Sequence, residues 1–152
     1  MRGLVEHPEA FTSSAEQESA RPLRWSQDRL EPDRLRPHDL FLGAFAAGML
    51  VGIVGLQGRY RPKERHNATV VGMYVAPEAA GKGVGRALMQ ELLQQVTALQ
   101  GLEQLDLTVT DGNDRARALY THCGFTVWGS LPRAVKVGER YFAKLHMCRP
   151  LR

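Results

Sequence analysis

The sequence has no long apolar run and few cysteines. None of its apolar stretches approaches the roughly 20 residues that a membrane-spanning helix needs, and its first residues show no signal-peptide pattern, so we expect no membrane association. Its two cysteines, Cys123 and Cys148, lack the spacing of metal ligands. Such sparse cysteine is typical of a reducing compartment, and we expect a cytoplasmic protein without a metal.

Two common nucleotide-binding loops are also missing. A Walker loop is excluded because no Gly-Lys-Ser or Gly-Lys-Thr occurs at the required spacing. A dinucleotide fingerprint fits poorly, because Gly81, Gly83 and Gly85 simply alternate. Asp106 lies at about the right distance for a ribose ligand, but it falls inside the next expected strand. The net charge of +4 is scattered along the chain, which indicates an anionic ligand and argues against nucleic acid.

The length of 152 residues and the 43% hydrophobic content suit one globular domain with its own core. Ser13 with Glu16, or Ser14 with Gln17, predicts a capping box for a short N-terminal helix, and a second helix is expected near 25–30. Apolar periodicity predicts strands at 41–46, 49–56, 69–75, 105–109, 125–128, 133–137 and 141–148, and helices at 84–99 and 113–122. This order indicates an α/β domain with a mixed sheet.

A glycine-rich loop before the helix at 84–99 is the most informative segment that is present. Gly81, Gly83 and Gly85 lack Cβ atoms, so the backbone there can turn tightly and lie against an anion. The first N–H groups of the following helix have no intrahelical partners, and Lys82 and Arg86 add positive charge. The loop therefore predicts a phosphate-binding site. The alternative is that the glycines only let strand and helix pack closely.

A second motif, over 113–125, has Asn, then Ala three residues later, then Leu-Tyr and Gly-Phe. Together with Tyr-Val-x-Pro-Glu and Gly-x-Gly-x-Gly in the first motif, it resembles the GCN5-related N-acetyltransferases (GNAT). The tail is similar to a bacterial branch of unassigned acceptor. The resemblance implies a single GNAT domain over 1–152. It also implies a mixed, mostly antiparallel sheet, splayed between the strands near 69–75 and 104–110 and flanked by helices.

The resemblance also implies acetyl-CoA as cosubstrate, with no metal. The strand at 69–75 would pair with pantetheine, and the N–H of Val75 would lie near the acetyl carbonyl. The glycine loop would hold the pyrophosphate, and Asn113 would touch the pantetheine arm. The implied cofactor-binding residues are Met73, Tyr74, Val75, Gly81, Lys82, Gly83, Val84, Gly85, Arg86, Asn113 and Tyr120.

Tyr120 matches the family's proton donor to the leaving thiolate. Coenzyme A leaves as a thiolate whose reference pKa is about 8.5, and a phenol with a pKa near 10 can protonate it. The alternative is a half-buried aromatic on the inner face of its helix. Cys123, which shares that helix end, is interpreted as a small packed residue, because His122 does not lie one helical turn away from it.

The general base is a departure from the family, because threonines occupy both positions where relatives often carry glutamate, Thr69 and Thr108. Either a base comes from elsewhere, a water relay serves, or the amine arrives neutral. His66 is the best substitute, since an imidazole pKa near 6.5 suits a base. Ala80 replaces the Arg or Gln that usually begins the loop, and its loss should weaken coenzyme binding modestly.

The N-terminus is a further departure. Only five residues precede the segment Glu6–Phe11, whereas the family normally begins with a strand and a full helix. The first strand is thus expected to be missing, which leaves the next strand as an open edge. Either the start is truncated or a second subunit, as in a homodimer, covers that edge.

The predicted function is acetyl transfer from acetyl-CoA to a primary amine of a small molecule or peptide, by direct attack in a ternary complex. Residues 6–14, 57–67 and 129–141 are expected to line the acceptor pocket. The alternative is an acyl-CoA-binding sensor with little turnover, favoured by the missing glutamates and by Ala80.

Overall fold

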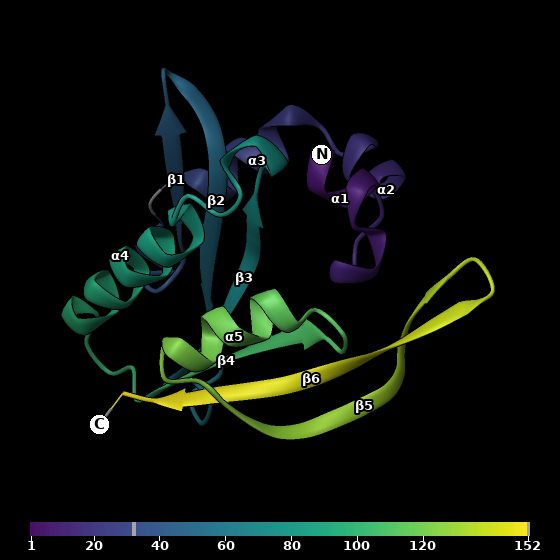
Figure 1. The fold of residues 1–152 in the computed structure, drawn as a ribbon. Helices are drawn as coiled ribbons and strands as arrows, with labels where there is room; N and C mark the ends of the chain where they lie inside the picture. The colour runs from purple at the N-terminus through teal and green to yellow at the C-terminus, as the bar shows by residue number, and fades with distance from the viewer. Residues whose placement is uncertain (32, 152) are drawn as a thin grey trace. The chain divides into compact units, whose positions relative to one another are not determined.

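The computed structural model describes residues 1–31 and 33–151. They form two compact units, 1–28 with 107–148, and 29–31 and 33–106 with 149–151. Within the described residues, a mixed sheet of six strands has the order β1-β2-β3-β4-β6-β5 (Figure 1). The elements are α1 (Arg2–Glu6), η1 (Pro8–Ala10), α2 (Ala15–Ser19), α3 (Leu23–Leu30), β1 (Leu40–Ala46), β2 (Met49–Gly58), β3 (Asn67–Val75), η2 (Pro77–Ala79), α4 (Val84–Ala98), β4 (Gln104–Thr110), α5 (Asp114–His122), β5 (Thr126–Val137) and β6 (Arg140–Pro150).

The mixed sheet with flanking helices confirms the predicted fold class. The predicted strands 41–46 and 49–56 correspond to β1 and β2, which pair antiparallel as a hairpin around Ala47 and Gly48. Both turn residues have positive φ, 49° and 78°, as a tight turn matched to the twist of the strands requires. Among the described residues β1 is the first strand and lies at an edge of the sheet, in agreement with the expected open edge.

Helix α4 buries the apolar stripe that its periodicity predicted. Leu88, Met89, Leu92 and Val96 are its buried residues. In the same unit, Val54 and Leu56 of β2 and Leu105 of β4 are fully buried. Figure 1 shows α4 running across β1 and β2. The burial of these apolar side chains anchors the helix whose first turn follows the glycine loop.

A bulge interrupts β3 shortly before its end. The register with β2 shifts so that Gly72 and Met73 together lie opposite Val54. Gly72 has φ +63°, a left-handed conformation that favours glycine. The bulge sets the direction in which the last residues of β3, including Val75, present their backbone.

The unit of 1–28 and 107–148 combines short N-terminal helices with α5 and the long hairpin of β5 and β6. Of the two capping boxes considered, the Ser14–Gln17 box is present at α2. The predicted strands 125–128 and 133–137 were wrong as separate elements, because they form one strand, β5. Its pairing with β6 is irregular between Leu131 and Val135. The strand absorbs Pro132, which has no N–H, in that irregularity instead of ending there.

Candidate functional site

The glycine loop ends in an N-terminus of α4 that carries no side-chain cap. Gly83 is the N-cap residue, with φ +80°, and makes no side-chain hydrogen bond there. Gly81 has φ +78°. The loop and Lys82 are exposed. The first N–H groups of α4, with the positive end of its dipole, are thus left for an external anion.

Close packing does not explain the glycine at Gly83. A Cβ built on Gly83 meets nothing within 4 Å, so the positive φ is what favours glycine at this position. Close packing does apply at Gly52 on β2, where a Cβ would lie 3.0 Å from Leu88 Cδ1 and 3.1 Å from Val84 Cγ1. Gly52 therefore lets the first turn of α4 lie directly against the sheet. At Gly83, by contrast, glycine is favoured because of its backbone conformation.

The predicted pantetheine strand is β3. Its parallel pairing with β4 covers Asn67–Thr69 opposite Gln104–Asp106. The strand then runs on to Val75, and its partner on the other side over Tyr74 and Val75 is β2. Met73 lies in the bulge.

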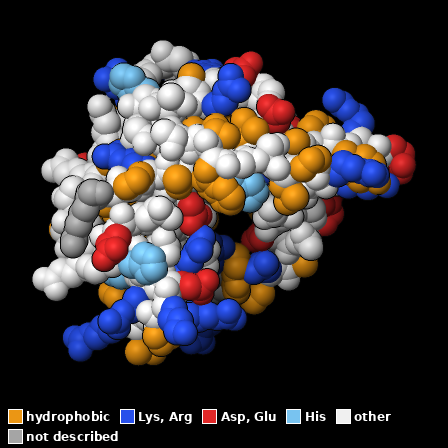
Figure 2. Space-filling model, turned by 90° about the horizontal axis from the view of Figure 1, so that it is seen from below, with side chains coloured by type: hydrophobic (Ala, Val, Ile, Leu, Met, Phe, Trp, Pro, Cys, Tyr) orange, Lys and Arg blue, Asp and Glu red, His pale blue; other side chains and the backbone are white. Residues whose placement is uncertain are grey.

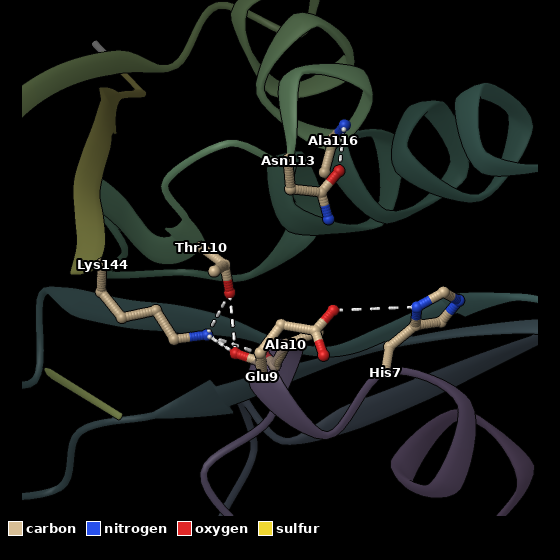
Figure 3. Close-up of polar contacts among 7 residues, drawn as sticks. All are labelled: His7, Glu9, Ala10, Thr110, Asn113, Ala116 and Lys144. Atoms are coloured by element: carbon tan, nitrogen blue, oxygen red, sulfur yellow. Dashed lines mark hydrogen bonds and ion pairs between the residues drawn. The ribbon is translucent and has the colours of Figure 1, made fainter. Parts of the chain in front are cut away.

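Asn113, which was expected to start the helix at 113–122, is the N-cap residue of α5. Its Oδ1 accepts a hydrogen bond of 3.1 Å from the N–H of Ala116 (Figure 3). This satisfies one of the first N–H groups of the helix. Because the oxygen is committed to the cap, the Nδ2 group is the part of Asn113 suited to donate to another partner.

Tyr120 is buried on α5, with 7% of its surface exposed. Its ring meets Phe125 edge-on, with ring centres 6.2 Å apart. Burial, and secondarily Cys123, raises the pKa of Tyr120 to about 12. The phenol therefore keeps its proton at neutral pH and can donate a hydrogen bond, while its raised pKa makes it a weaker acid than a free phenol.

His66 lies in the loop before β3. Its Nε2 is 3.0 Å from Asn67 Nδ2, and since an amide NH₂ can only donate, Nε2 is the acceptor. The nitrogen lone pair that a base needs is thus engaged by Asn67. Thr108 is exposed and cannot accept a proton at neutral pH in place of a carboxylate.

Asp106 provides a carboxylate that the sequence reasoning considered only as a poor ribose ligand. Its Oδ1 accepts a 2.8 Å hydrogen bond from Thr69 Oγ1, and its Oδ2 is ion-paired with Arg59. Thr69 and Asp106 are direct partners in the parallel register of β3 and β4. The alternation of Asp106 with Leu105 and Leu107 was a signal for its face, but the register was not readable from the sequence.

The other basic residues of the loop after β2 are exposed: Arg61, Lys63 and Arg65. Figure 2 shows Lys and Arg side chains in several separate groups with acidic side chains among them. The charge is distributed as the composition indicated, without one continuous basic patch on this face.

Residues 4–125 match the model of the Acetyltransferase (GNAT) family. Among curated proteins, the N-alpha-acetyltransferase RimI of Mycobacterium tuberculosis is 35% identical over 115 residues, covering 74% of this chain and 68% of that protein. An L-methionine sulfoximine/L-methionine sulfone acetyltransferase of Pseudomonas aeruginosa is 30% identical over 105 residues. That match covers 68% of this chain and 58% of the Pseudomonas protein.

Solved structures show the same fold. YncA of Salmonella typhimurium, described as a putative acetyltransferase with its cofactor acetyl-CoA, superposes with a TM-score of 0.79 at 21% identity, covering 99% of this chain and 83% of that one. A phosphinothricin acetyltransferase of Sinorhizobium meliloti in complex with AcCoA has a TM-score of 0.68 at 29% identity, covering 74% and 61%. No helix within residues 1–31 and 33–151 is long and apolar enough to cross a membrane.

Proposed function

This chain belongs to the GNAT family of acetyltransferases, and from that premise we propose that it transfers the acetyl group of acetyl-CoA to a primary amine. The observation that carries the proposal is the uncapped start of α4, with Gly83 held at φ +80°. Such a start offers backbone N–H groups and a positive dipole end to an anion, and acetyl-CoA carries a pyrophosphate.

We assign coenzyme binding to three parts of the chain. The backbone from Gly81 to Arg86 holds the pyrophosphate, with Lys82 adding charge. The end of β3, over Met73, Tyr74 and Val75, pairs with the pantetheine amides as an added strand would. Asn113 donates from Nδ2 while its Oδ1 caps α5. Ala80, where relatives often carry a polar side chain, leaves most of this binding to the backbone.

The reaction consists of one bond formed and one broken. The nitrogen of a neutral amine attacks the acetyl carbonyl carbon, and the N–H of Val75 stabilises the resulting oxyanion. The C–S bond then breaks, and the thiolate takes the proton of Tyr120. The nitrogen gives its surplus proton to a base, and one proton returns to Tyr120 to replace the one that the thiolate took, so the products are an N-acetyl amide and free coenzyme A. Because the pKa of Tyr120 is about 12, the phenol is still protonated when the thiolate leaves and can hydrogen-bond the sulfur, although it is a weaker acid than a free phenol.

Two residues compete for the role of base. His66 has the suitable imidazole, but its Nε2 already accepts from Asn67. Asp106 has a carboxylate whose two oxygens are oriented by Thr69 and Arg59, and unlike the single lone pair of His66 Nε2, each of these oxygens keeps a second lone pair for a proton. Because Thr69 stands where relatives often carry glutamate, its hydrogen bond to Asp106 brings a carboxylate from β4 next to that position, and this contact favours Asp106.

The acceptor is proposed to be a small-molecule or peptide amine. The names of the two small-molecule acetyltransferases above suggest L-methionine sulfone and phosphinothricin as test compounds. A structural neighbour described as a ribosomal-protein-alanine N-acetyltransferase of Brucella melitensis suggests a peptide beginning with alanine as a third. The protein is mixed with acetyl-CoA and each amine, and thiol release is followed. We expect acceptor-dependent release with at least one amine. Binding of acetyl-CoA without release above background on a broader amine panel would instead support the acyl-CoA sensor.

A further inference from the structure

Lys144 on β6 is a buried cation with 5% of its surface exposed. Its Nζ donates to the carbonyl of Glu9 at 3.0 Å, to the carbonyl of Ala10 at 2.9 Å and to Thr110 Oγ1 at 2.8 Å (Figure 3). An ammonium group has three N–H donors, so each has a partner. Thr110 Oγ1 in turn donates to the Glu9 carbonyl at 2.8 Å. The three acceptors and the cation form a closed clamp on η1.

Burying the ammonium group of Lys144 is unfavourable in free energy. Taking the ammonium out of water is unfavourable, and burial lowers the pKa of Lys144, against the opposing effect of Glu9. Replacing a buried charge by a well-packed apolar side chain is often neutral or stabilising. The gain from Lys144 therefore lies in the exact placement of the backbone at Glu9 and Ala10.

The clamp leaves the carboxylate of Glu9 outside it. Lys144 takes the main-chain oxygen of Glu9, while the side chain points away, with Oε1 3.8 Å from His7 Nδ1 (Figure 3). The side chain of Glu9 is 33% exposed. The Glu9 carboxylate is near enough to act on the pKa of Lys144, but the three donors of Lys144 are taken by other oxygens, and the carboxylate keeps exposed surface for another cation.

The clamp is also continuous with the start of α5. The carbonyl of Thr110 accepts a 3.0 Å hydrogen bond from the N–H of Asn113, the cap residue of that helix. Thr110 therefore links η1 by its hydroxyl and α5 by its carbonyl. Any shift of η1 changes the distance between the Glu9 carboxylate and the helix that carries Asn113 and Tyr120.

We propose that Lys144 is a positioning residue for the acceptor, which fixes η1 so that the Glu9 carboxylate binds the cationic amino group of the incoming amine. This inference rests on the proposed transferase function. An ammonium–carboxylate pair is a charge-assisted hydrogen bond, which suits recognition of an amine before it is deprotonated. The clamp acts on the acceptor and leaves coenzyme binding at the glycine loop unchanged.

The test compares Lys144→Met and Thr110→Val with wild type, on whichever of L-methionine sulfone, phosphinothricin and the alanine peptide is acetylated. We expect the acceptor KM to rise about tenfold or more, with kcat reduced far less and the Kd of acetyl-CoA unchanged. Thr110→Ser keeps the hydroxyl and restores the wild-type KM. Arg24→Met, at a side chain that is 87% exposed, is the control for losing a cation.

A double-mutant cycle separates the clamp from general loosening. Glu9→Gln alone should raise the acceptor KM, and adding it to Lys144→Met should raise KM little further, because both changes remove one interaction. Full additivity overturns the proposal, as does an unchanged acceptor KM in folded Lys144→Met. If Lys144→Met does not fold, Thr110→Val decides by the same criterion. Wild-type protein that acetylates no amine refutes the transferase function and the clamp proposal with it, whereas wild-type turnover with an unchanged KM in the variants refutes the clamp alone.

Discussion

Thr69 and Asp106 are joined side by side across the parallel strands β3 and β4, with Thr69 Oγ1 donating to Asp106 Oδ1 at 2.8 Å. Arg59 pairs with the other carboxylate oxygen. A hydroxyl that cannot act as a base is thereby coupled to a carboxylate that can. This geometry is the basis for proposing Asp106, on the neighbouring strand β4, as the general base.

Asp106→Asn tests this assignment. We expect kcat to fall by about 10²–10⁴, the range for loss of a general base, while His66→Gln stays near wild type. Thr69→Val is the matched control, because it removes the hydrogen bond and keeps the carboxylate. Its kcat should therefore fall less than that of Asp106→Asn. Steady-state kinetics across pH 6–9 provide the measurement. A larger loss in His66→Gln than in Asp106→Asn would return the role to His66.

Tyr120→Phe tests the proton donor. The variant keeps the ring against Phe125 and removes only the hydroxyl, so folding should be unchanged while kcat falls about 10²-fold. Because the pKa of Tyr120 is raised to about 12, deprotonation of this phenol should not reduce wild-type activity up to pH 10. Full turnover by Tyr120→Phe would show that the thiolate is protonated by another group.

Gly83→Ala tests the conformation of the glycine loop. A Cβ there meets no neighbour, so the cost comes from φ +80° alone. The substitution should lower the unfolding free energy by about 1–2 kcal/mol, or by less where the loop relaxes to another conformation. We expect weaker acetyl-CoA binding in the same variant. Gly83→Asn is the control, since Asn tolerates the left-handed region better. Equal effects of Ala and Asn would mean that φ is not what matters at this position.

The two roles of Asn113 separate in a pair of substitutions. Asn113→Ala removes the cap and should lower the unfolding free energy by about 0.5–2 kcal/mol. Asn113→Asp keeps an oxygen acceptor for the Ala116 N–H but loses the Nδ2 donor, so it should keep stability and bind acetyl-CoA less tightly. Denaturant unfolding and coenzyme titration check the two readouts. Unchanged coenzyme affinity in Asn113→Asp would limit Asn113 to capping.

Local patterns predicted most of the elements, and the glycine loop with its helix was the best defined of them. Gly83 could be identified because a left-handed residue and an uncapped helix start are local properties. The strand β5 was divided wrongly at Pro132, since a sequence does not show whether a proline ends a strand or sits in a bulge.

Contacts that depend on how distant strands align could not be predicted from the sequence. Thr69 and Asp106 are 37 positions apart, and their contact depends on the parallel alignment of β3 with β4. Lys144 is 135 positions from Glu9, and in the alternating pattern of β6 it resembled a solvent-facing lysine. No local signal distinguishes a buried lysine with backbone partners from an exposed one.

The pH dependence of stability gives an independent measurement on Lys144. Burial lowers the pKa of Lys144 in the folded protein, whereas in the unfolded chain it is about 10.4. Between these two values the unfolded chain binds more protons than the folded protein, so the contribution of this group to stability rises with pH, and below the folded pKa its full charging cost is present.

Lys144→Met removes this dependence, so the unfolding free energy of wild type minus that of Lys144→Met should increase as pH rises toward 10. Denaturant unfolding at several pH values between 7 and 10 measures it, with Arg24→Met as the control that should run parallel to wild type. Parallel curves for Lys144→Met as well would mean that the ammonium of Lys144 is no harder to charge in the folded protein than in water.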